Sequence, residues 1–489
     1  MYSVTAQADV HAFSWFFKRV VRRHFFAKKK VPQDVSFRSA DFGIAFDVDG
    51  VFTRGPIVLP GAFRASEMLH EKNGNWRVPV LFLTNAANVS KETKAAELSS
   101  ILNRKVIHFQ ILPSEIVMPH SALRLYSVFD KHVAVCGHGP LKAIAQSIGF
   151  KKFSTVEDIS AAFPWLDACR PKEALYSFIS LLAIVLLGEP QRWEQSLQII
   201  LDLLIQNGDL NKTSEGILRK KIKLAKSSSP QLPIFACGSD LLWASNAPNP
   251  RIAMGSFMCC LDALYEKLTG QHLTYTSLLG KPNPLVYTFA LSQLNAIAAK
   301  RFGATRPLKR IYCIGSDNPE VDIYGANLFN LYLQTISEET WSSLFLLVNT
   351  LVQEEHPCLF PDPSTTICER PEILSEKEQD KWSSLIRRSK DMFEILRELV
   401  MRKPKRPSPC TMEPVLVTSG VYQEHEGVPG EWKGLHHVLH DFPDLSHLYE
   451  PRFVAPNVAE AVASILSLES ALGSSQPTSI PASANGDLN

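Results

Sequence analysis

The sequence lacks the cysteine pattern of a disulfide-rich or zinc-binding protein. The chain of 489 residues has only 9 cysteines, and none of them stands in a Cys-x-x-Cys pair. Zinc sites and disulfide frameworks both depend on regular cysteine spacing, which is missing here. The cysteine pattern therefore excludes both classes and favours a reducing compartment, where unpaired thiols persist.

Long apolar runs and a strong charge of one sign are missing as well. The longest charge-free apolar run, from Ala174 to Gly188, falls short of the ~20 residues that cross a bilayer as a helix. The formal net charge is only +2, and the basic cluster from Arg402 to Arg406 is typical of a solvated linker. No Gly-x-x-x-x-Gly-Lys-[Ser/Thr] motif occurs, which argues against a P-loop nucleotidase. We expect no transmembrane segment and no nucleic-acid partner.

The first 38 residues are basic and contain few acids. Phe13, Phe16 and Phe17 fall at helical spacing, and Arg19 and Arg22 occupy the other side of the predicted helix. A basic, amphipathic, acid-poor leader is typical of a mitochondrial presequence, and a basic surface helix is the alternative. We therefore expect the protein in the mitochondrion, with the cytoplasm as the alternative.

From residue 41 onward, short apolar runs alternate with helical patterns. The runs Phe42 to Phe46, Val78 to Leu83 and Lys309 to Gly315 are typical of buried strands. Strands that alternate with helices predict an α/β fold with a parallel sheet. A second series of strands and helices, between about residues 133 and 237, predicts an inserted α/β unit.

Two carboxylates stand directly after the first of these strands. Asp47 and Asp49 are separated by one residue and followed by Gly50, so strand alternation directs both side chains to one point. In an open α/β sheet, ligands bind at this carboxyl end of the strands. The pair suits a hard cation such as Mg²⁺, or a nucleophile beside an acid/base. An ordinary Asp-Gly turn is the alternative.

Further polar groups follow predicted strands or precede helices: Thr84-Asn85, Lys281, and Asp317 with Asp322. Taken singly, each has a simpler explanation as a capping turn, a surface turn or a helix N-terminus. Taken together, they supply a carboxylate nucleophile, a hydroxyl and an amide for phosphate oxygens, a cation, and carboxylates for a metal. This combination favours a phosphoryl-transfer site.

The order of these motifs resembles that of the haloacid dehalogenase-like hydrolases. The resemblance covers about residues 40–335 and 412–468, and the long segment between the second and third motifs is similar to the C2-capped, NagD-like branch. It implies a Rossmann-like core with a parallel sheet and an inserted α/β C2-type cap. The motifs that carry it, in chain order, are Asp47-Val48-Asp49-Gly50-Val51, Leu83-Thr84-Asn85, Gly280-Lys281-Pro282, and the run from Gly315 to Asp322.

The resemblance also implies a role for each acidic residue. Asp47 would attack phosphorus, and Asp49 would act as the acid/base. Mg²⁺ would lie between the carboxylate of Asp47, the main-chain carbonyl of Asp49 and the carboxylate of Asp317. Asp322 would be a second ligand or would orient the site.

The remaining motif residues would hold the substrate. By the same resemblance, Thr84, Asn85 and Lys281 would bind the phosphoryl oxygens. The loop Gly238, Ser239, Asp240 stands where capped phosphatases often place substrate-selecting residues. Ser316, between Gly315 and Asp317, departs from many relatives, in which Gly and Asp are adjacent.

Changes in composition along the chain predict seven segments. The long stretch rich in Glu, Lys, Ser and Pro is typical of an insertion with low order. The predicted segments are a basic leader at 1–38, core parts at 39–124, 253–336 and 412–469, a cap at 125–252, a charged and partly disordered insertion at 337–411, and a disordered tail at 470–489.

These features favour a Mg²⁺-dependent phosphatase that hydrolyses a small phosphorylated metabolite through an aspartyl-phosphate. Two alternatives stay open: a catalytically weak binding or assembly protein on the same fold, and a phosphotransferase or mutase on that fold. Relatives with such caps often dimerise through them, so the resemblance also implies a homodimer.

Overall fold

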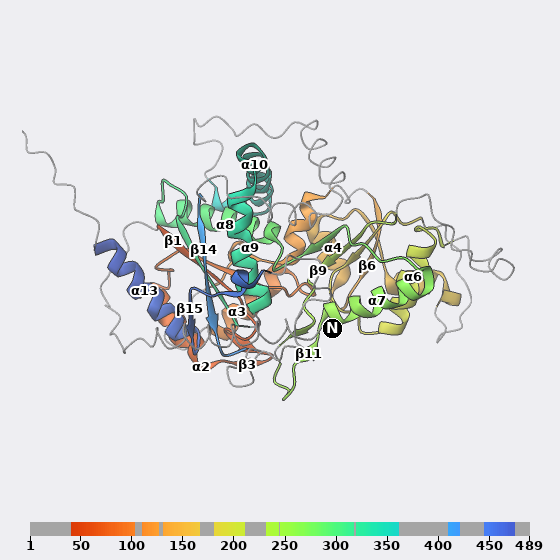
Figure 1. Ribbon diagram of the computed structural model, residues 1–489, viewed down its shortest axis with the longest axis horizontal. Coiled ribbons are helices and arrows are strands. Elements are labelled where there is room, and N and C mark those ends of the chain that lie inside the picture. The colour runs from red at the N-terminus through yellow and green to blue at the C-terminus, as the bar shows by residue number, and fades with distance from the viewer. Residues whose placement is uncertain are drawn as a thin grey trace, which may run out of the picture.

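The computed structural model describes residues 41–102, 110–126, 131–166, 180–210, 231–243, 245–316, 319–360, 409–420 and 445–474. The predicted leader at 1–38 and Asp317, a predicted metal ligand, lie outside these ranges. Two parallel sheets, each flanked by helices, make up most of the described chain (Figure 1). The α/β fold class predicted from the sequence is confirmed, with its parallel core sheet and inserted second unit.

The core sheet has the strand order β15-β14-β13-β1-β4-β5, and all its pairs are parallel. Its central strand β1, which precedes Asp47, pairs with β13 on one side and β4 on the other, and all its residues are buried. Because β1 is paired on both sides, the backbone that leads into Asp47 is held rigidly. The strands are β1 (Phe42–Phe46), β4 (Val80–Leu83), β5 (Ile116–Val117), β13 (Arg310–Gly315), β14 (Thr411–Val417) and β15 (Phe453–Ala455).

Helices cover both faces of the core sheet. Alternation along β1 sends Ile44 and Phe46 to one face and Ala45 to the other. The face of Ile44 packs against α2 (Pro60–Leu69), α3 (Lys91–Leu102) and α13 (Val458–Ser474). The opposite face packs against α8 (Pro284–Phe302), α9 (Tyr324–Thr335) and α10 (Glu338–Glu355).

Helix α10 occupies the beginning of the segment that the sequence predicts as a partly disordered insertion at 337–411. Ser337 caps the helix by accepting a hydrogen bond from the backbone N–H of Thr340. Trp341, Leu344 and Val348 are buried in the cluster that contains α8. The average composition of 337–411 hides this apolar stripe, so the prediction of low order is wrong for α10. The rest of the segment, 361–408, lies outside the described residues.

The second sheet forms the cap, with the strand order β12-β9-β8-β6-β7 and parallel pairs throughout. Helix α4 (Leu141–Ile148) covers one face, and α5 (Val156–Ala162), α6 (Trp193–Ile205) and α7 (Met254–Thr269) cover the other (Figure 1). The strands are β6 (His132–Cys136), β7 (Lys152–Thr155), β8 (Ala183–Leu186), β9 (Ile234–Cys237) and β12 (Ser277–Leu279).

The cap extends beyond the boundary at residue 252 that the sequence suggests. Helix α7 packs in the cap cluster, and β12 pairs with β9 at the edge of the cap sheet. Strand β12 has only 3 residues, too few for a recognisable apolar period. The predicted second core part, 253–336, therefore begins inside the cap.

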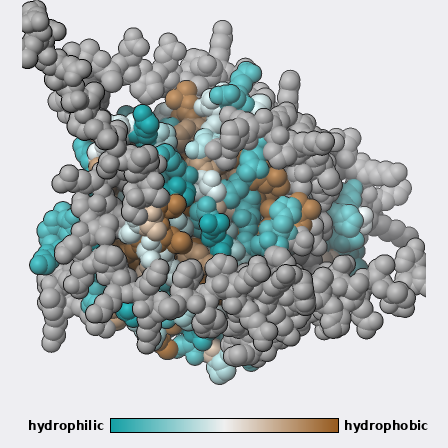
Figure 2. Space-filling view, turned by 60° about the vertical axis from the view of Figure 1, so that its left-hand side comes forward, coloured by the Kyte–Doolittle hydropathy of each residue, from teal (hydrophilic) through white to brown (hydrophobic). Residues whose placement is uncertain are grey.

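Within the described ranges, no helix is both long and apolar enough to cross a membrane. Figure 2 shows one face of the molecule, on which hydrophilic residues and smaller hydrophobic groups are interspersed wherever the surface is not grey.

Candidate active site

The carboxyl ends of β1 and β4, two strands of the same parallel sheet, carry the first two polar side chains of the site. Asp47 follows β1 directly, and its backbone N–H donates to the carbonyl of Ile314 on β13 at 2.8 Å. Thr84 follows β4 and is 1% exposed, with its Oγ1 accepting from the backbone N–H of Ala86 at 3.1 Å. Because parallel strands end on the same edge of the sheet, residues distant in the sequence meet there.

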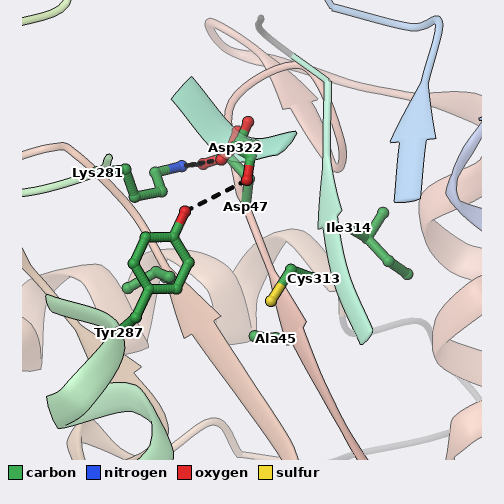
Figure 3. A pocket seen from close by; sticks show the side chains of 8 residues that line it. Ala45, Asp47, Lys281, Tyr287, Cys313, Ile314 and Asp322 are labelled. Atoms are coloured by element: carbon green, nitrogen blue, oxygen red, sulfur yellow. Dashed lines mark hydrogen bonds and ion pairs between the residues drawn. The ribbon is translucent and has the colours of Figure 1, made fainter. Parts of the chain in front are cut away.

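Lys281 bridges two buried carboxylates at this edge. Its Nζ lies 2.6 Å from Oδ1 of Asp47 and 2.7 Å from Oδ1 of Asp322. Figure 3 shows the lysine side chain reaching both acidic residues from one side. Burial alone would lower the pKa of Lys281, but the charges of Asp322 and Asp47 raise it well above its usual range. The ammonium group therefore stays charged and balances part of the negative charge.

Each of the two carboxylates also keeps one oxygen unpaired. Oδ2 of Asp47 and Oδ2 of Asp322 are buried and accept no hydrogen bond from the described residues. A buried carboxylate oxygen without a partner is costly, and oxygen donors are the ligands that Mg²⁺ prefers. The described ranges contain no group of three or more metal-binding side chains, but Asp317 lies outside them. The two open oxygens fit a hard divalent cation.

Asp322 reaches the site through a local departure from ordinary helix geometry. It lies on a π-helical turn, η5 (Pro319–Ile323), immediately before α9. Gly315 allows the close approach, since a Cβ there would lie 2.2 Å from Cβ of Asp322. The hydroxyl of Tyr287 donates to the main-chain carbonyl of Asp322 at 3.3 Å. A small cavity, lined in part by these residues, opens beside the carboxylates (Figure 3).

Burial raises the pKa of two further acidic residues near Asp47, which are Asp49 and Asp322. It raises the pKa of Asp49 to about 6, with a further contribution from Asp47, while Lys94 and Lys281 oppose the rise. Burial also raises the pKa of Asp322, and Lys281 opposes this shift. Asp49 therefore keeps its proton to a higher pH than an ordinary aspartate does, as a general acid/base requires.

The side chain of Asn85 connects the core to the cap. Its Nδ2 donates to Oδ2 of Asp240 at 2.8 Å and to the carbonyl of Lys281 at 3.0 Å. Its Oδ1 accepts from the backbone N–H of Lys281 at 2.7 Å. The side-chain amide of Asn85 is thus fully engaged, and only its backbone remains for the predicted role in phosphate binding.

The predicted cap loop does reach the site. Gly238, Ser239 and Asp240 follow β9, and the loop lies against the second motif through Asn85. Burial raises the pKa of Asp240 to about 6. Its Oδ1 is buried and accepts no hydrogen bond from the described residues.

The structure adds two residues that the sequence did not single out. Tyr287 bonds to Asp322, but a tyrosine in an apolar helix is typical of a core position, so it gave no signal. Lys94 faces Asp49 from α3 and is 6% exposed. Its place on the apolar side of the predicted helix at 90–102 is unusual for a lysine, and this could have indicated a buried charge partner.

Comparison with known proteins identifies related chains. A family model described as haloacid dehalogenase-like hydrolase matches residues 44–151. A cardiolipin synthase (CMP-forming)/mitochondrial hydrolase fusion protein of Schizosaccharomyces pombe is 27% identical over 330 residues. That match covers 63% of this chain and 50% of the fusion protein. A mitochondrial hydrolase of Saccharomyces cerevisiae is 29% identical over 318 residues, which cover 59% of this chain and 84% of the yeast protein.

Among solved structures, NagD from E. coli K-12 is similar to this chain at 14% identity and a TM-score of 0.39. The alignment covers 87% of this chain and 98% of NagD.

Proposed function

Because residues 44–151 match a haloacid dehalogenase-like hydrolase model and two relatives are named as hydrolases, we propose that the chain is a Mg²⁺-dependent phosphatase of that family. Its substrate would be a small phosphate ester, hydrolysed through an aspartyl-phosphate on Asp47. The observation that supports this proposal most strongly is the Lys281 ammonium between Asp47 and Asp322, with one oxygen of each carboxylate left open. This is the charge pattern that phosphoryl transfer needs.

Asp47 is the proposed nucleophile, and Lys281 its electrostatic partner. Asp47 would attack phosphorus through its carboxylate, and the bond from Lys281 to its Oδ1 would hold that carboxylate in place. As the phosphoryl group transfers, negative charge spreads over its oxygens, and the buried ammonium stabilises that charge. The hydroxyl of Thr84 can donate to a further phosphoryl oxygen, because its Oγ1 only accepts from Ala86.

Asp49 is the proposed acid/base. It would donate a proton to the leaving oxygen and then accept one from the water that hydrolyses the aspartyl-phosphate. A carboxyl with an ordinary pKa near 4 is a poor proton donor at neutral pH. The pKa of about 6 that burial gives Asp49 suits both steps.

The proposed cation is Mg²⁺. Asp47, the main-chain carbonyl of Asp49, Asp317 and Asp322 are the residues that would hold it. When bound, it would supply positive charge to the phosphoryl oxygens.

The cap would limit the size of the substrate and exclude water. The bond between Asn85 and Asp240 holds the cap loop against the core, which supports a small phosphorylated metabolite as the substrate. We assign the chain to the C2-capped, NagD-like branch on the basis of this inserted parallel sheet. The basic leader and the two yeast relatives named as mitochondrial support a mitochondrial location.

The test is phosphate release from a panel of small phosphate esters, with Mg²⁺ and with a chelator. We expect release only with Mg²⁺ and no detectable release by Asp47→Asn. Asp41→Asn is the matched control, because Asp41 precedes the same strand and its carboxylate forms an exposed ion pair with Lys309. Full activity of Asp47→Asn would refute the mechanism.

A further inference from the structure

A buried serine hydroxyl bonds to the main-chain carbonyl of the proposed acid/base. Oγ of Ser316 donates to the carbonyl oxygen of Asp49 at 3.0 Å, and Ser316 is 0% exposed. Ser316 lies directly after β13, and Asp49 lies in the loop after β1, so the bond links two strand ends of the site. The accepting oxygen is the one assigned above to the proposed Mg²⁺.

Two further hydrogen bonds connect the same loop to the residues that follow β14. Oγ of Ser419, after β14, donates to the carbonyl of Gly50 at 2.7 Å. Nη2 of Arg54, on the short strand β2 (Thr53–Arg54), donates to the carbonyl of Gly420 at 2.6 Å. We call these three bonds, from Ser316, Ser419 and Arg54, the carbonyl clasp. Together they fix the backbone that follows Asp47.

Gly420 restricts the position of Ser316 within the clasp. A Cβ at Gly420 would lie 2.5 Å from Oγ of Ser316 and 2.7 Å from its carbonyl oxygen. The glycine therefore allows the backbone after β14 to pack directly on Ser316. This contact leaves the hydroxyl little freedom to turn away from Asp49.

We propose that Ser316 is a positioning residue for the main-chain carbonyl of Asp49. It holds this carbonyl in the orientation that the proposed Mg²⁺ ligand requires, so the inference rests on the proposed function. A carbonyl oxygen has two lone pairs, and one can accept from Ser316 while the other faces a cation. The proposal gives a role to the extra residue between Gly315 and Asp317.

The primary test is a calorimetric titration of the full chain with MgCl₂ in the absence of substrate. Loss of a group that orients a metal ligand typically costs ~10- to 100-fold in metal affinity. We expect Ser316→Ala to bind Mg²⁺ about 10-fold more weakly than the unmodified chain. The matched control is Ser464→Ala, since Oγ of Ser464 also donates to a main-chain carbonyl, that of Glu460 at 2.9 Å, but on α13. The control should bind Mg²⁺ with unchanged affinity.

A second variant tests the same role without removing the hydroxyl. Gly420→Ala forces Ser316 to move and should also weaken Mg²⁺ binding about 10-fold. This variant decides the question if Ser316→Ala does not fold, as judged by circular dichroism. For both variants, the Mg²⁺ concentration that gives half-maximal phosphate release should rise by the same factor. The kcat at saturating Mg²⁺ should stay within about 3-fold of the unmodified chain, because the reacting groups are intact.

The outcomes separate this inference from the proposed function. Unchanged or tighter Mg²⁺ binding by Ser316→Ala and Gly420→Ala overturns the inference and leaves the phosphatase proposal standing. If the unmodified chain binds Mg²⁺ but releases no phosphate, weaker binding by the variants still supports the inference while the phosphatase proposal fails. An unmodified chain that binds no Mg²⁺ overturns both.

Discussion

Nδ2 of Asn85 lies 2.8 Å from Oδ2 of Asp240, so one hydrogen bond joins the core directly to the cap loop. The same side chain makes two bonds with the backbone of Lys281. A single amide therefore connects the second motif, the third motif and the cap. Its loss should disturb Lys281 as well as the cap.

We predict graded losses of kcat/KM at this junction. Asp240→Ala removes one hydrogen bond to a charged group, worth ~1.5–3 kcal/mol, and should lower kcat/KM by about 10-fold. Asn85→Ala removes all three bonds and should lower kcat/KM by about 100-fold or more. Steady-state kinetics on the best ester of the panel would measure both losses.

The control for this series is Asn330→Ala. Asn330 also makes paired bonds with a backbone, those to Met412 at 2.8 Å each, but away from the site. It should lose stability and keep kcat/KM. Equal losses in all three variants would show that the effect of Asn85 is merely structural.

Replacing Lys281 by methionine should destabilise the fold. The change leaves the buried carboxylates of Asp47 and Asp322 without their cation. Breaking a buried ion pair from one side typically costs ~3–5 kcal/mol. We expect a loss of about 3 kcal/mol in urea unfolding with chelator present. Lys309→Met, which breaks an exposed pair with Asp41, should change stability by less than about 1 kcal/mol.

The buried His120 should make stability depend on pH. Burial, with a smaller effect from Lys91, lowers the pKa of His120 from 6.5 to about 4, while Glu355 opposes the shift. In the unfolded chain the imidazole takes up a proton near pH 6.5, but in the fold it stays neutral until about pH 4. Its contribution is therefore fully present above pH 6.5 and is lost as the pH falls toward 4.

The expected loss from His120 is about 3 kcal/mol between these pH values, since one pKa unit corresponds to ~1.4 kcal/mol. Urea unfolding at pH 7 and pH 4.5 would measure it. His120→Gln should reduce the difference between the two pH values, whereas the exposed His272→Gln should leave it unchanged. Equal pH dependence in the His120 variant and the unmodified chain would contradict the prediction.

Trp341→Ala tests whether α10 is part of the core. The indole is 7% exposed, stacks on Phe345 and contacts the edge of Phe329. Truncation of a buried tryptophan typically costs ~3–5 kcal/mol, and we expect the midpoint of urea unfolding to fall accordingly. Leu268→Ala, at a half-exposed position on α7, should have little effect. If the two variants were equally stable, α10 would not support the core.

The parts of the fold that the sequence predicts are those with a strong local pattern. The apolar run before Asp47 predicts β1, and the structure places it at the centre of the sheet. Lys281 and Asp322 could be singled out because they stand in a series of motifs whose order resembles that of a known family. The structure brings both to Asp47, while their catalytic roles stay predictions.

Other features depend on tertiary contacts and leave little trace in the sequence. Strand β12 is too short for a period, and α10 lies within a charged stretch. The bonds of Asn85 and Ser316 join residues far apart in the chain, so no local spacing predicts them. A short polar side chain next to a motif has many possible partners, and only the fold selects one.

Only Gly280 separates Leu279, the last residue of β12, from Lys281. The cap sheet and Lys281 are thus parts of one continuous piece of backbone, whereas both carboxylates belong to the core. The position of the ammonium group beside Asp47 therefore depends on the backbone geometry at the edge of the cap sheet.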